Sequence, residues 1–508
     1  MKLNLQISAG LLALLMFSGS LNAQDGVLDV SFGNNGIVRT ISTHEAFDMA
    51  IQNDGKIIVA GSIYMGSGND DMAVARYNAD GSLDNSFGSN GIVNIDFNGG
   101  NDDASSVAIQ SDGKIVIAGR AQNASNNNSD IAVIRLNSDG SPDNSFATTG
   151  KYQLDVDGYA FDYALDIALH TDGKIVLVAM AGTDMFAKTA IIRLNTNGTL
   201  DNTFDGDGII KPFSFGSFTL SSLYAVTIQS DGKILIGGSK NNNFAVARLN
   251  SDGSLDNIYG ADGIYSSTTP VVSECKLELQ NDGKLVATYS SASQNEVRMV
   301  RINSNGIEDA AFGVNGTVIT QISSNTAYPE FSKGIVIQPD GKIIVAGSSY
   351  TTSFDSDYLV IRYNSDGSID NSFGTSGNGI VTTSVEANDD DRGKVVKLQS
   401  DGKIVVAGSS CIGSCDFVLL RYNNTSGTSG INNSSTTSEF KIFPNPNNGQ
   451  FSIQIERGGV FELMDITGKV LNTYTIKNTN HIINEKLSPG LYFIRETESH
   501  TATKIIIE

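Results

Sequence analysis

The sequence predicts an all-β protein, a seven-bladed β-propeller closed by its N-terminal strand and followed by a small C-terminal immunoglobulin-like β-sandwich. Three observations predict this fold class. One unit recurs seven times at intervals of 51 to 61 residues, Asp-Gly turns separate short apolar runs within it, and the last unit lacks a segment that stands alone near the N-terminus. The chain of 508 residues has 53 Gly, only 8 Pro and no long amphipathic helical pattern, which favours strands and tight turns.

Three short signatures mark the repeated unit. The first is Asp-Gly-Lys followed by an apolar run, with aspartates at Asp54, Asp112, Asp172, Asp231, Asp282, Asp340 and Asp401. The second is Arg, an apolar or Tyr residue, and Asn, with arginines at Arg76, Arg135, Arg193, Arg248, Arg301, Arg362 and Arg421. The third is Leu-Asp-x-Ser-Phe-Gly or a degenerate form, with aspartates at Asp29, Asp84, Asp143, Asp201, Asp256, Asp309 and Asp370.

Each unit is expected to form four strands. In the second unit we expect them at residues 106–110, 114–119, 130–137 and about 150–155. Gln-x-Asp-Gly-Lys joins the first two strands and Asn-x-Asp-Gly-Ser joins the last two, because glycine adopts the positive φ that a tight hairpin needs. Since runs such as residues 115–118 are apolar on both faces, each sheet is expected to stack between two others.

The phase of the repeats favours a ring over an open rod. The Leu-Asp segment of residues 28–38 stands alone at the mature N-terminus, and the last Arg-x-Asn signature, residues 421–423, has no such segment after it. An N-terminal strand that completes the last blade explains this split, and it removes both free sheet edges.

The spacing also predicts a cross-strand ion pair in each blade. A three-residue loop at residues 79–81 would place Arg76 opposite Asp84, and the same separation of eight residues recurs in the other units. The other pairs within one unit are Arg135/Asp143, Arg193/Asp201, Arg248/Asp256, Arg301/Asp309 and Arg362/Asp370. Arg421 is expected to pair with Asp29 across the closure, and such partly buried pairs fix register more than they add net stability.

Together these signatures resemble the bacterial delta-60 repeat family, which is regarded as propeller-forming, over roughly residues 26–424. The third and fifth units depart from the pattern, with Asn197-Gly198 and Asn305-Gly306 in place of Asp-Gly, but Asn serves the same turn. The resemblance implies a propeller and leaves the activity open.

The ends of the chain indicate export. Residues 1–23 have the features of a signal peptide, with Lys2 before a short apolar stretch and Ala23 at the expected cleavage point; an uncleaved anchor is the alternative. The propeller is expected at residues 24–424, a flexible polar linker at 425–438 and a second β domain at 439–508. No other stretch is apolar for long enough to cross a membrane as a helix.

The last 70 residues carry four distinctive segments, which are residues 443–446 (Phe-Pro-Asn-Pro), 465–469, 487–492 and 504–507. Together they resemble the C-terminal sorting domain of type IX secretion cargo in Bacteroidetes-type bacteria. The resemblance implies handling by the type IX secretion machinery, export across the outer membrane, and release or surface attachment. An ordinary immunoglobulin-like binding module is the alternative.

Charge and cysteine content narrow the possible partners. A net charge of −21 argues against nucleic acid, whose phosphates require a basic face, and suits solubility or cationic partners. Cys411 and Cys415 lie four residues apart and can close a small disulfide loop in an oxidising compartment, whereas Cys275 is expected to be a buried thiol. No second Cys/His pair accompanies them, so zinc is not expected.

We assign no catalytic residue, cofactor or metal ligand from the sequence. It contains no His-Glu-x-x-His, Gly-x-Ser-x-Gly or Walker-type motif. Asn-x-Asp-Gly-x-x-Asp, as at residues 137–143, is similar to part of a calcium loop, but an arginine two residues before it opposes a dication. This element is therefore interpreted as a turn with an ion pair.

A binding face is expected where the connections vary. Both glycine turns lie on one face of the ring, so the two variable connections of each unit lie on the other, and function usually resides in variable loops on a rigid scaffold. We place the candidate binding face at His44, Glu45, Asp71, Asp103, Tyr159, Asp162, Phe215, Glu330, Asp357 and Asp391. An acidic rim with aromatic residues suits a glycan, a peptide or calcium; the alternative is that the acids serve only solubility and the turns where strands begin.

The favoured function is that of a secreted or surface-attached, noncatalytic binding scaffold, a monomeric propeller with a glycan or protein ligand. A propeller hydrolase or lyase acting on polysaccharide is the first alternative, and two acids about 5 to 10 Å apart in one cleft would favour it. A structural or adhesive surface protein is the second alternative, suggested by the repetition itself.

Overall fold

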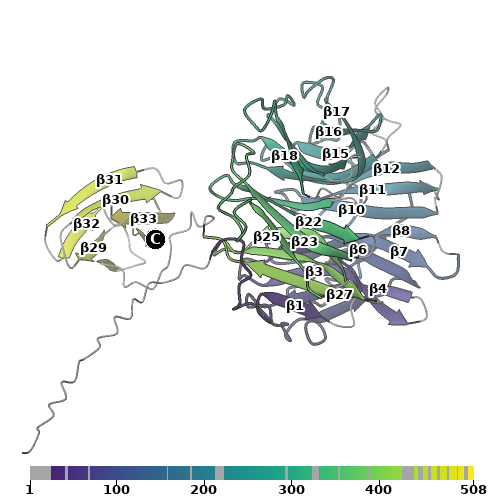
Figure 1. Cartoon of the computed structure of the whole chain (residues 1–508), viewed down its shortest axis with the longest axis horizontal. Coiled ribbons are helices and arrows are strands. Elements are labelled where there is room, and N and C mark those ends of the chain that lie inside the picture. The colour runs from purple at the N-terminus through teal and green to yellow at the C-terminus, as the bar shows by residue number, and fades with distance from the viewer. Residues whose placement is uncertain are drawn as a thin grey trace, which may run out of the picture.

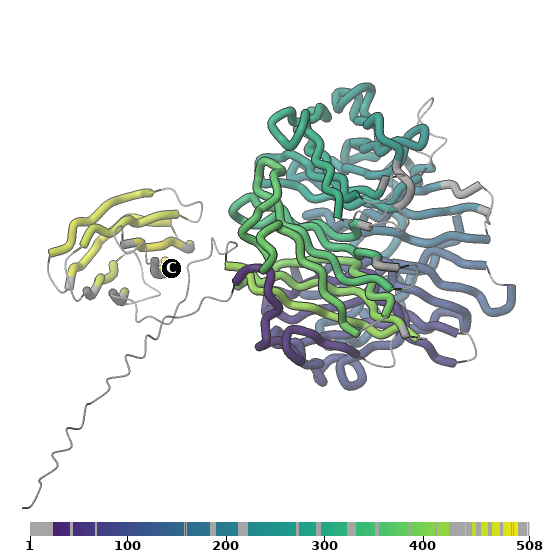
Figure 2. The backbone as a smooth tube through the Cα atoms, in the orientation of Figure 1, coloured from purple at the N-terminus to yellow at the C-terminus, as the bar shows by residue number. Residues whose placement is uncertain are grey.

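The computed structural model contains 34 strands and no helix in the part of the chain that it describes (Figures 1 and 2). The described residues are 24–40, 44–66, 69–126, 128–156, 158, 160–183, 186–211, 222–291, 296–322, 331–352, 355–386, 389–412, 414–425, 440–443, 450–455, 459–465, 470–477, 480–488, 490–496 and 502–507. The signal peptide (1–23) and most of the linker (426–438) that the sequence predicts lie outside them. No helix in the described part is long and apolar enough to span a membrane.

Strands β1 to β27 form the predicted seven-bladed propeller, with four antiparallel strands in each blade. The innermost strands of blades 1 to 7 are β2 (Ala46–Ile51), β6 (Gly99–Ile109), β10 (Phe161–Leu169), β14 (Ser222–Ile228), the second half of β17 (Ile264–Leu279), β21 (Phe331–Ile337) and β25 (Asp390–Leu398). The second strands are β3 (Ile57–Gly66), β7 (Ile115–Asn123), β11 (Ile175–Thr183), β15 (Ile234–Lys240), β18 (Leu285–Ser291), β22 (Ile343–Thr352) and β26 (Ile404–Ile412).

The third strands are β4 (Asn69–Tyr77), β8 (Ser129–Leu136), β12 (Phe186–Leu194), β16 (Asn243–Leu249), β19 (Glu296–Ile302), β23 (Asp355–Tyr363) and β27 (Ser414–Tyr422). The outermost strands are β5 (Ile92–Ile95), β9 (Lys151–Leu154), β13 (Ile209–Ile210), the first half of β17, β20 (Thr317–Gln321), β24 (Ile380–Thr383) and, in blade 7, β1 (Ile37–Thr40). In the second unit the predicted strands are all present, but the innermost begins seven residues earlier than expected, at Gly99 instead of residue 106.

The ring closes where the sequence predicted it. Strand β1 pairs antiparallel with β27, with Ile37 opposite Leu420, and Leu28 bridges Tyr422. Figures 1 and 2 show this N-terminal segment lying beside blade 7. The closure therefore joins the first described strand to the last strand of the propeller.

The core lies between neighbouring blades. The run 115–118 is fully buried, with Ile115 and Ile117 packed toward blade 1 and Val116 and Ala118 packed toward blade 3. Each sheet is covered on both faces, which explains why its central strands are continuous apolar runs and lack the alternation of a half-exposed sheet.

The Arg-x-Asn signature forms the same network in every blade. The arginine Nε donates to the carboxylate of the predicted aspartate at 2.6–2.8 Å in all seven pairs, including Arg421 and Asp29. The guanidinium lies 4.5–4.8 Å from the ring centroid of the Phe or Tyr three residues after that aspartate. The Asp-Gly-Lys lysine also pairs with the same carboxylate, as Lys403 does with Asp29.

This arginine also links consecutive blades. Arg135 Nη1 donates to the carbonyl oxygen of Thr196 in the next blade at 2.5 Å, and Arg421 donates to that of Ala79 in blade 1. Blade 7 lacks an Asn-x-Asp-Gly turn, and Arg362 instead bonds Asp25 and Asn424 at 2.7 and 2.6 Å. The signature is thus a structural element of the ring.

The C-terminal strands form two sheets around one core. One sheet holds β28 (Phe440–Phe443), β29 (Gln450–Ile455) and β32 (Asn480–Asn484). The other holds β31 (Val470–Ile476), β30 (Gly459–Asp465), β33 (Gly490–Glu496) and β34 (Ala502–Ile507). Ile453 and Ile483 of the first sheet share a buried cluster with Leu463 and Ile494 of the second. The immunoglobulin-like connectivity stays a prediction.

Candidate binding site at the mouth of the central channel

The seven innermost strands surround a central channel with a volume of about 450 Å³. Its charged lining residues include Asp48, Asp166 and Lys276, which come from different blades. Asp48 Oδ2 accepts the Val107 N–H at 2.9 Å, so this carboxylate joins blade 1 to blade 2. Burial opposes the charge of Lys276, but Asp166 and Asp48 together raise its pKa above the usual value.

At the channel mouth on the variable-loop face, three of the predicted residues have close charged partners. Nδ1 of His44 lies 3.2 Å from the carboxylate of Asp70, and Glu45 accepts a bond of 2.7 Å from Arg392. Asp103 pairs with Arg120. Burial raises the pKa of Asp103 despite this partner. Glu45 and Asp103 each neutralise an arginine, so neither is a free carboxylate.

A small cationic cavity of about 160 Å³ adjoins this mouth between blades 6 and 7. Its lining includes Lys333, Tyr350, Arg392 and Lys394. Lys333 is paired with Glu274 at 2.6 Å, whereas Lys394 forms no ion pair with an acid in the described part of the chain. The ammonium of Lys394 lies 5.5 Å from the centroid of the Phe47 ring, and burial, followed by the charge of Lys333, lowers its pKa.

The sequence did not single out Lys333 and Lys394. A signal was nevertheless present, because both occupy the position seven residues before the Asp-Gly-Lys aspartate. The other units carry Phe47, Ser105, Leu165, Tyr224 and Cys275 there. Two adjacent blades supply a lysine at this position, and both lysines line the small cavity.

The deeper acids of the predicted face occupy the junctions between blades. Asp162 and Asp391, with the related Asp102, are fully buried at or just before the start of an innermost strand. Their Oδ2 atoms accept the N–H groups of Val156, Val385 and Phe97 at 2.6–2.7 Å, which fixes the connection from the preceding blade. Burial raises the pKa of Asp102 and of Asp162 to about 7, and that of Asp391 to about 6. These three side chains face the junction, away from the open mouth.

The other predicted residues divide into two groups. Asp71 is buried beside Asp96 and Asp102, with one carboxylate oxygen of each within 4.8 Å of the others, but both oxygens of Asp102 already accept backbone N–H groups. Asp357 lies at the junction of blades 6 and 7, where burial raises its pKa. Tyr159, Phe215 and Glu330 lie outside the described residues.

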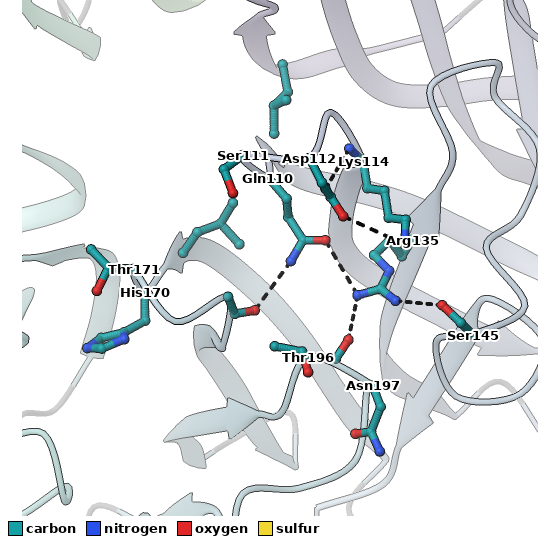
Figure 3. Close-up of a pocket in the computed structure, with 13 residues that line it drawn as sticks. Gln110, Ser111, Asp112, Lys114, Arg135, Ser145, His170, Thr171, Thr196 and Asn197 are labelled. Atoms are coloured by element: carbon teal, nitrogen blue, oxygen red, sulfur yellow. Dashed lines mark hydrogen bonds and ion pairs between the residues drawn. The ribbon is translucent and has the colours of Figure 1, made fainter. Parts of the chain in front are cut away.

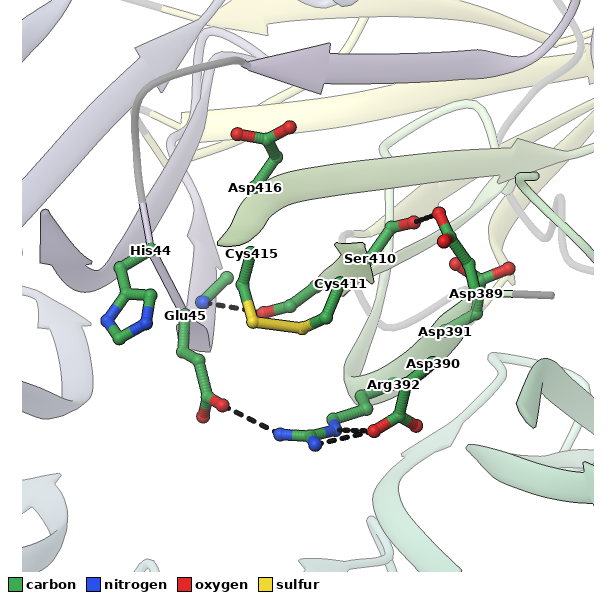
Figure 4. Close-up of a disulfide and its surroundings, with 12 residues drawn as sticks. His44, Glu45, Asp389, Asp390, Asp391, Arg392, Ser410, Cys411, Cys415 and Asp416 are labelled. Atoms are coloured by element: carbon green, nitrogen blue, oxygen red, sulfur yellow. Dashed lines mark hydrogen bonds and ion pairs between the residues drawn. A yellow bond between two sulfur atoms is a disulfide. The ribbon is translucent and has the colours of Figure 1, made fainter. Parts of the chain in front are cut away.

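A disulfide joins Cys411 and Cys415 across the end of the β26–β27 hairpin, beside Glu45 (Figure 4). Cys275 is a buried free thiol, and burial raises its pKa above the usual range, which makes it unreactive.

The opposite face, which carries the glycine turns, has a cavity of about 610 Å³ between blades 2 and 3 (Figure 3). Several of its polar side chains already have partners, either within a blade or across the junction. Arg135 bonds Thr196 and Ser145, and His170 Nδ1 lies 2.8 Å from Asp172. We therefore place the candidate binding site at the channel mouth.

Seven β-sheet repeats closed into a ring, followed by a second β-domain, define a propeller-type repeat protein. Both the propeller and the C-terminal domain match known protein families. Seven segments match the family described as "Domain of unknown function (DUF5122) beta-propeller", namely residues 52–87, 110–146, 170–204, 229–257, 280–312, 338–373 and 399–428. Residues 441–508 match the family described as "Secretion system C-terminal sorting domain". The propeller therefore belongs to the first family and the C-terminal domain to the second, and the protein is exported to the cell surface or beyond by type IX secretion.

The chain is also similar to several solved structures, at low identity. Polysaccharide lyase Uly1 is 11% identical, with 77% of this chain and 99% of that chain covered and a TM-score of 0.44. An α-L-arabinofuranosidase from Fusarium graminearum is 8% identical over 79% and 97%, with a TM-score of 0.38. The propeller domain of the Trilobed protease from Pyrococcus furiosus is 10% identical over 74% and 96%, with a TM-score of 0.32. No curated protein matches the chain.

Proposed function

We propose that this protein is a noncatalytic binding scaffold at the cell surface, and that the mouth of its central channel holds an acidic saccharide. The observation that carries the proposal is Lys394. Its ammonium is partly buried beside the like charge of Lys333, without an acidic partner of its own among the described residues. A cation in that position is stabilised by an anion from solution, which supplies the missing counter-charge.

The charge of the whole protein makes this cavity selective. With a net charge of −21, most of the surface repels anions. Lys394 is a local exception, because Lys333 and Arg392 beside it already pair with Glu274 and with Glu45 and Asp390. Tyr350 and Ser348 in the same lining add an aromatic ring and a hydroxyl, the groups that pack against sugar rings and bond sugar hydroxyls. A uronate or a sulfated sugar combines both requirements.

The test compares ligands on the full chain. We expect polygalacturonate and chondroitin sulfate to bind, and neutral dextran not to bind, in isothermal titration calorimetry. Lys394→Gln should weaken binding about tenfold, because one charged hydrogen bond is lost. Lys240→Gln removes the same charge at the end of β15 in blade 4, outside the cavity, and should leave the affinity unchanged. Equal binding of acidic and neutral glycans, or equal losses in the two variants, would refute the proposal.

A lyase is the second candidate, favoured by one observation. Elimination next to a carboxylate needs a base whose pKa lies closer to neutrality than that of a free lysine, and burial and the charge of Lys333 lower the pKa of Lys394. The same incubations distinguish this candidate, because elimination produces the ultraviolet absorbance of an unsaturated uronate. Hydrolysis is disfavoured, since Glu45 and Asp103 at the mouth are held by Arg392 and Arg120.

A further inference from the structure

The junction between blades 6 and 7 buries two neighbouring carboxyl groups. Asp389, the residue just before β25, and Asp391, the second residue of β25, are both fully buried. Figure 4 shows the two carboxylates next to each other beside Ser410, whose hydroxyl donates to Oδ2 of Asp389 at 2.8 Å. Burial and then the charge of Asp389 raise the pKa of Asp391.

One oxygen of each carboxylate has no hydrogen-bond partner. Oδ2 of Asp391 accepts the Val385 N–H at 2.7 Å, but Oδ1 of Asp391 and Oδ1 of Asp389 are buried without a bond to any described group. The corresponding Asp102 in blade 2 uses both oxygens, which accept the N–H groups of Phe97 and Gln122. Buried polar atoms are rarely left in this state, because desolvation is then uncompensated.

A third carboxylate adds to the uncompensated charge. Asp357 on β23 acts electrostatically on Asp391. At the junction of blades 7 and 1 the corresponding Asp416 is neutralised by Arg39, whose Nε donates at 2.8 Å. Within the described ranges, no basic side chain pairs with Asp357, Asp389 or Asp391. Arg392, the next residue along the strand, is turned toward Asp390 and Glu45 (Figure 4).

We propose that a calcium ion fills this place, bound by the Oδ1 atoms of Asp389 and Asp391 with Asp357 supplying further negative charge. Calcium takes carboxylate oxygens in flexible geometry, and extracellular modules bind it with dissociation constants of roughly 10⁻⁴ to 10⁻³ M. The ion replaces the arginine that serves the neighbouring junction, and it fixes the start of β25 between blades 6 and 7. This site is independent of the proposed saccharide site.

The experiment uses the full chain, stripped with EGTA and titrated with CaCl₂ by calorimetry and thermal unfolding. We expect saturable binding in the stated range and a rise in Tm of about a few degrees at saturation. Asp389→Asn and Asp391→Asn should each abolish the calcium-dependent rise in Tm that comes from this site. Asp262→Asn is the matched control, since it removes the same charge at an exposed turn with a φ of 56°, which Asn tolerates.

Two results would overturn the site. One is a Tm that does not respond to calcium at concentrations well above the stated range of dissociation constants. The other is an Asp389→Asn variant whose calcium response equals that of the wild type. In EGTA the Asn variants should unfold at or above the wild-type Tm, because one of two like charges is gone. Asp357→Asn, at a partly exposed position, tests the same ion if a buried variant does not fold.

Discussion

The Nε atom of Arg421 donates a hydrogen bond of 2.8 Å to Oδ2 of Asp29, and this bond joins residues that lie 392 positions apart in the chain. The same guanidinium reaches the Ala79 carbonyl of blade 1 and lies 4.5 Å from the centroid of the Phe32 ring. One arginine therefore holds the closing strand, the last blade and the first blade together.

A double-mutant cycle at the closure tests this relationship. Asp29→Asn and Arg421→Gln should each destabilise the propeller, and the double variant should be more stable than the sum of the single losses predicts, by about 1–3 kcal/mol. Guanidinium unfolding of the four proteins measures the coupling. The Asp84 and Arg76 pair, which lies within one blade, gives the reference cycle. Strictly additive losses at positions 29 and 421 would show that the two side chains do not interact.

Two glycines distinguish the cost of a positive φ from the cost of a steric clash between neighbouring blades. Gly113 and Gly306 have φ values of +84° and +83°, so alanine at either position is strained, at a cost of about 1–2 kcal/mol. A Cβ on Gly113 would meet nothing within 4 Å, whereas a Cβ on Gly306 would lie 2.3 Å from the Gly260 nitrogen in the neighbouring blade. Gly306→Ala should therefore destabilise the protein considerably more than Gly113→Ala. Equal unfolding midpoints for the two variants would contradict the close approach.

Stability should depend on pH in two windows of opposite sign. Asp29 and Asp84 have lowered pKa values, so their contribution is present above their unfolded pKa near 3.9 and is lost as the pH falls through the folded value. Asp102 and Asp162 have pKa values raised to about 7, so their protonated forms favour folding and stability declines as the pH rises from about 4 to 7. In EGTA, the Tm should therefore be highest at about pH 4, where both contributions are present, and about a few degrees lower at about pH 7.

Asp102→Asn combined with Asp162→Asn is the check on the second window. Asn keeps an acceptor for the Phe97 and Val156 N–H groups but does not titrate. The Tm of this variant should change less between pH 5 and 7 than that of the wild type. If the Tm of this variant falls with pH as steeply as that of the wild type, other groups cause the decline.

Loss of the Cys411–Cys415 disulfide should cost about 2 kcal/mol, the value expected for closing so short a loop in the unfolded chain. The Cys411→Ser, Cys415→Ser double variant and the reduced wild type should show the same lower unfolding midpoint. A reductant effect of equal size on the double variant would point to a different cause.

The repeat phase let the sequence predict the ring, because the missing segment of the last unit and the extra segment at the N-terminus are visible without coordinates. The Arg and Asp spacing likewise predicted each cross-strand pair, since an eight-residue separation around a tight turn leaves little geometric freedom. The reach of Arg135 to Thr196 in the next blade was not predicted, because it depends on how two sheets stack.

For the candidate site the sequence identified the variable-loop face but not the residues at its centre. It named acids such as Asp162 and Asp391, which lie buried in the blade junctions, and it passed over Lys333 and Lys394. Local periodicity determined the strands, the turns and the register, because these follow from backbone geometry within one unit, and the phase of the repeats determined the closure. Only the tertiary structure decided which side chains from different blades meet, since the radial packing of seven sheets brings together residues that no repeat pattern relates.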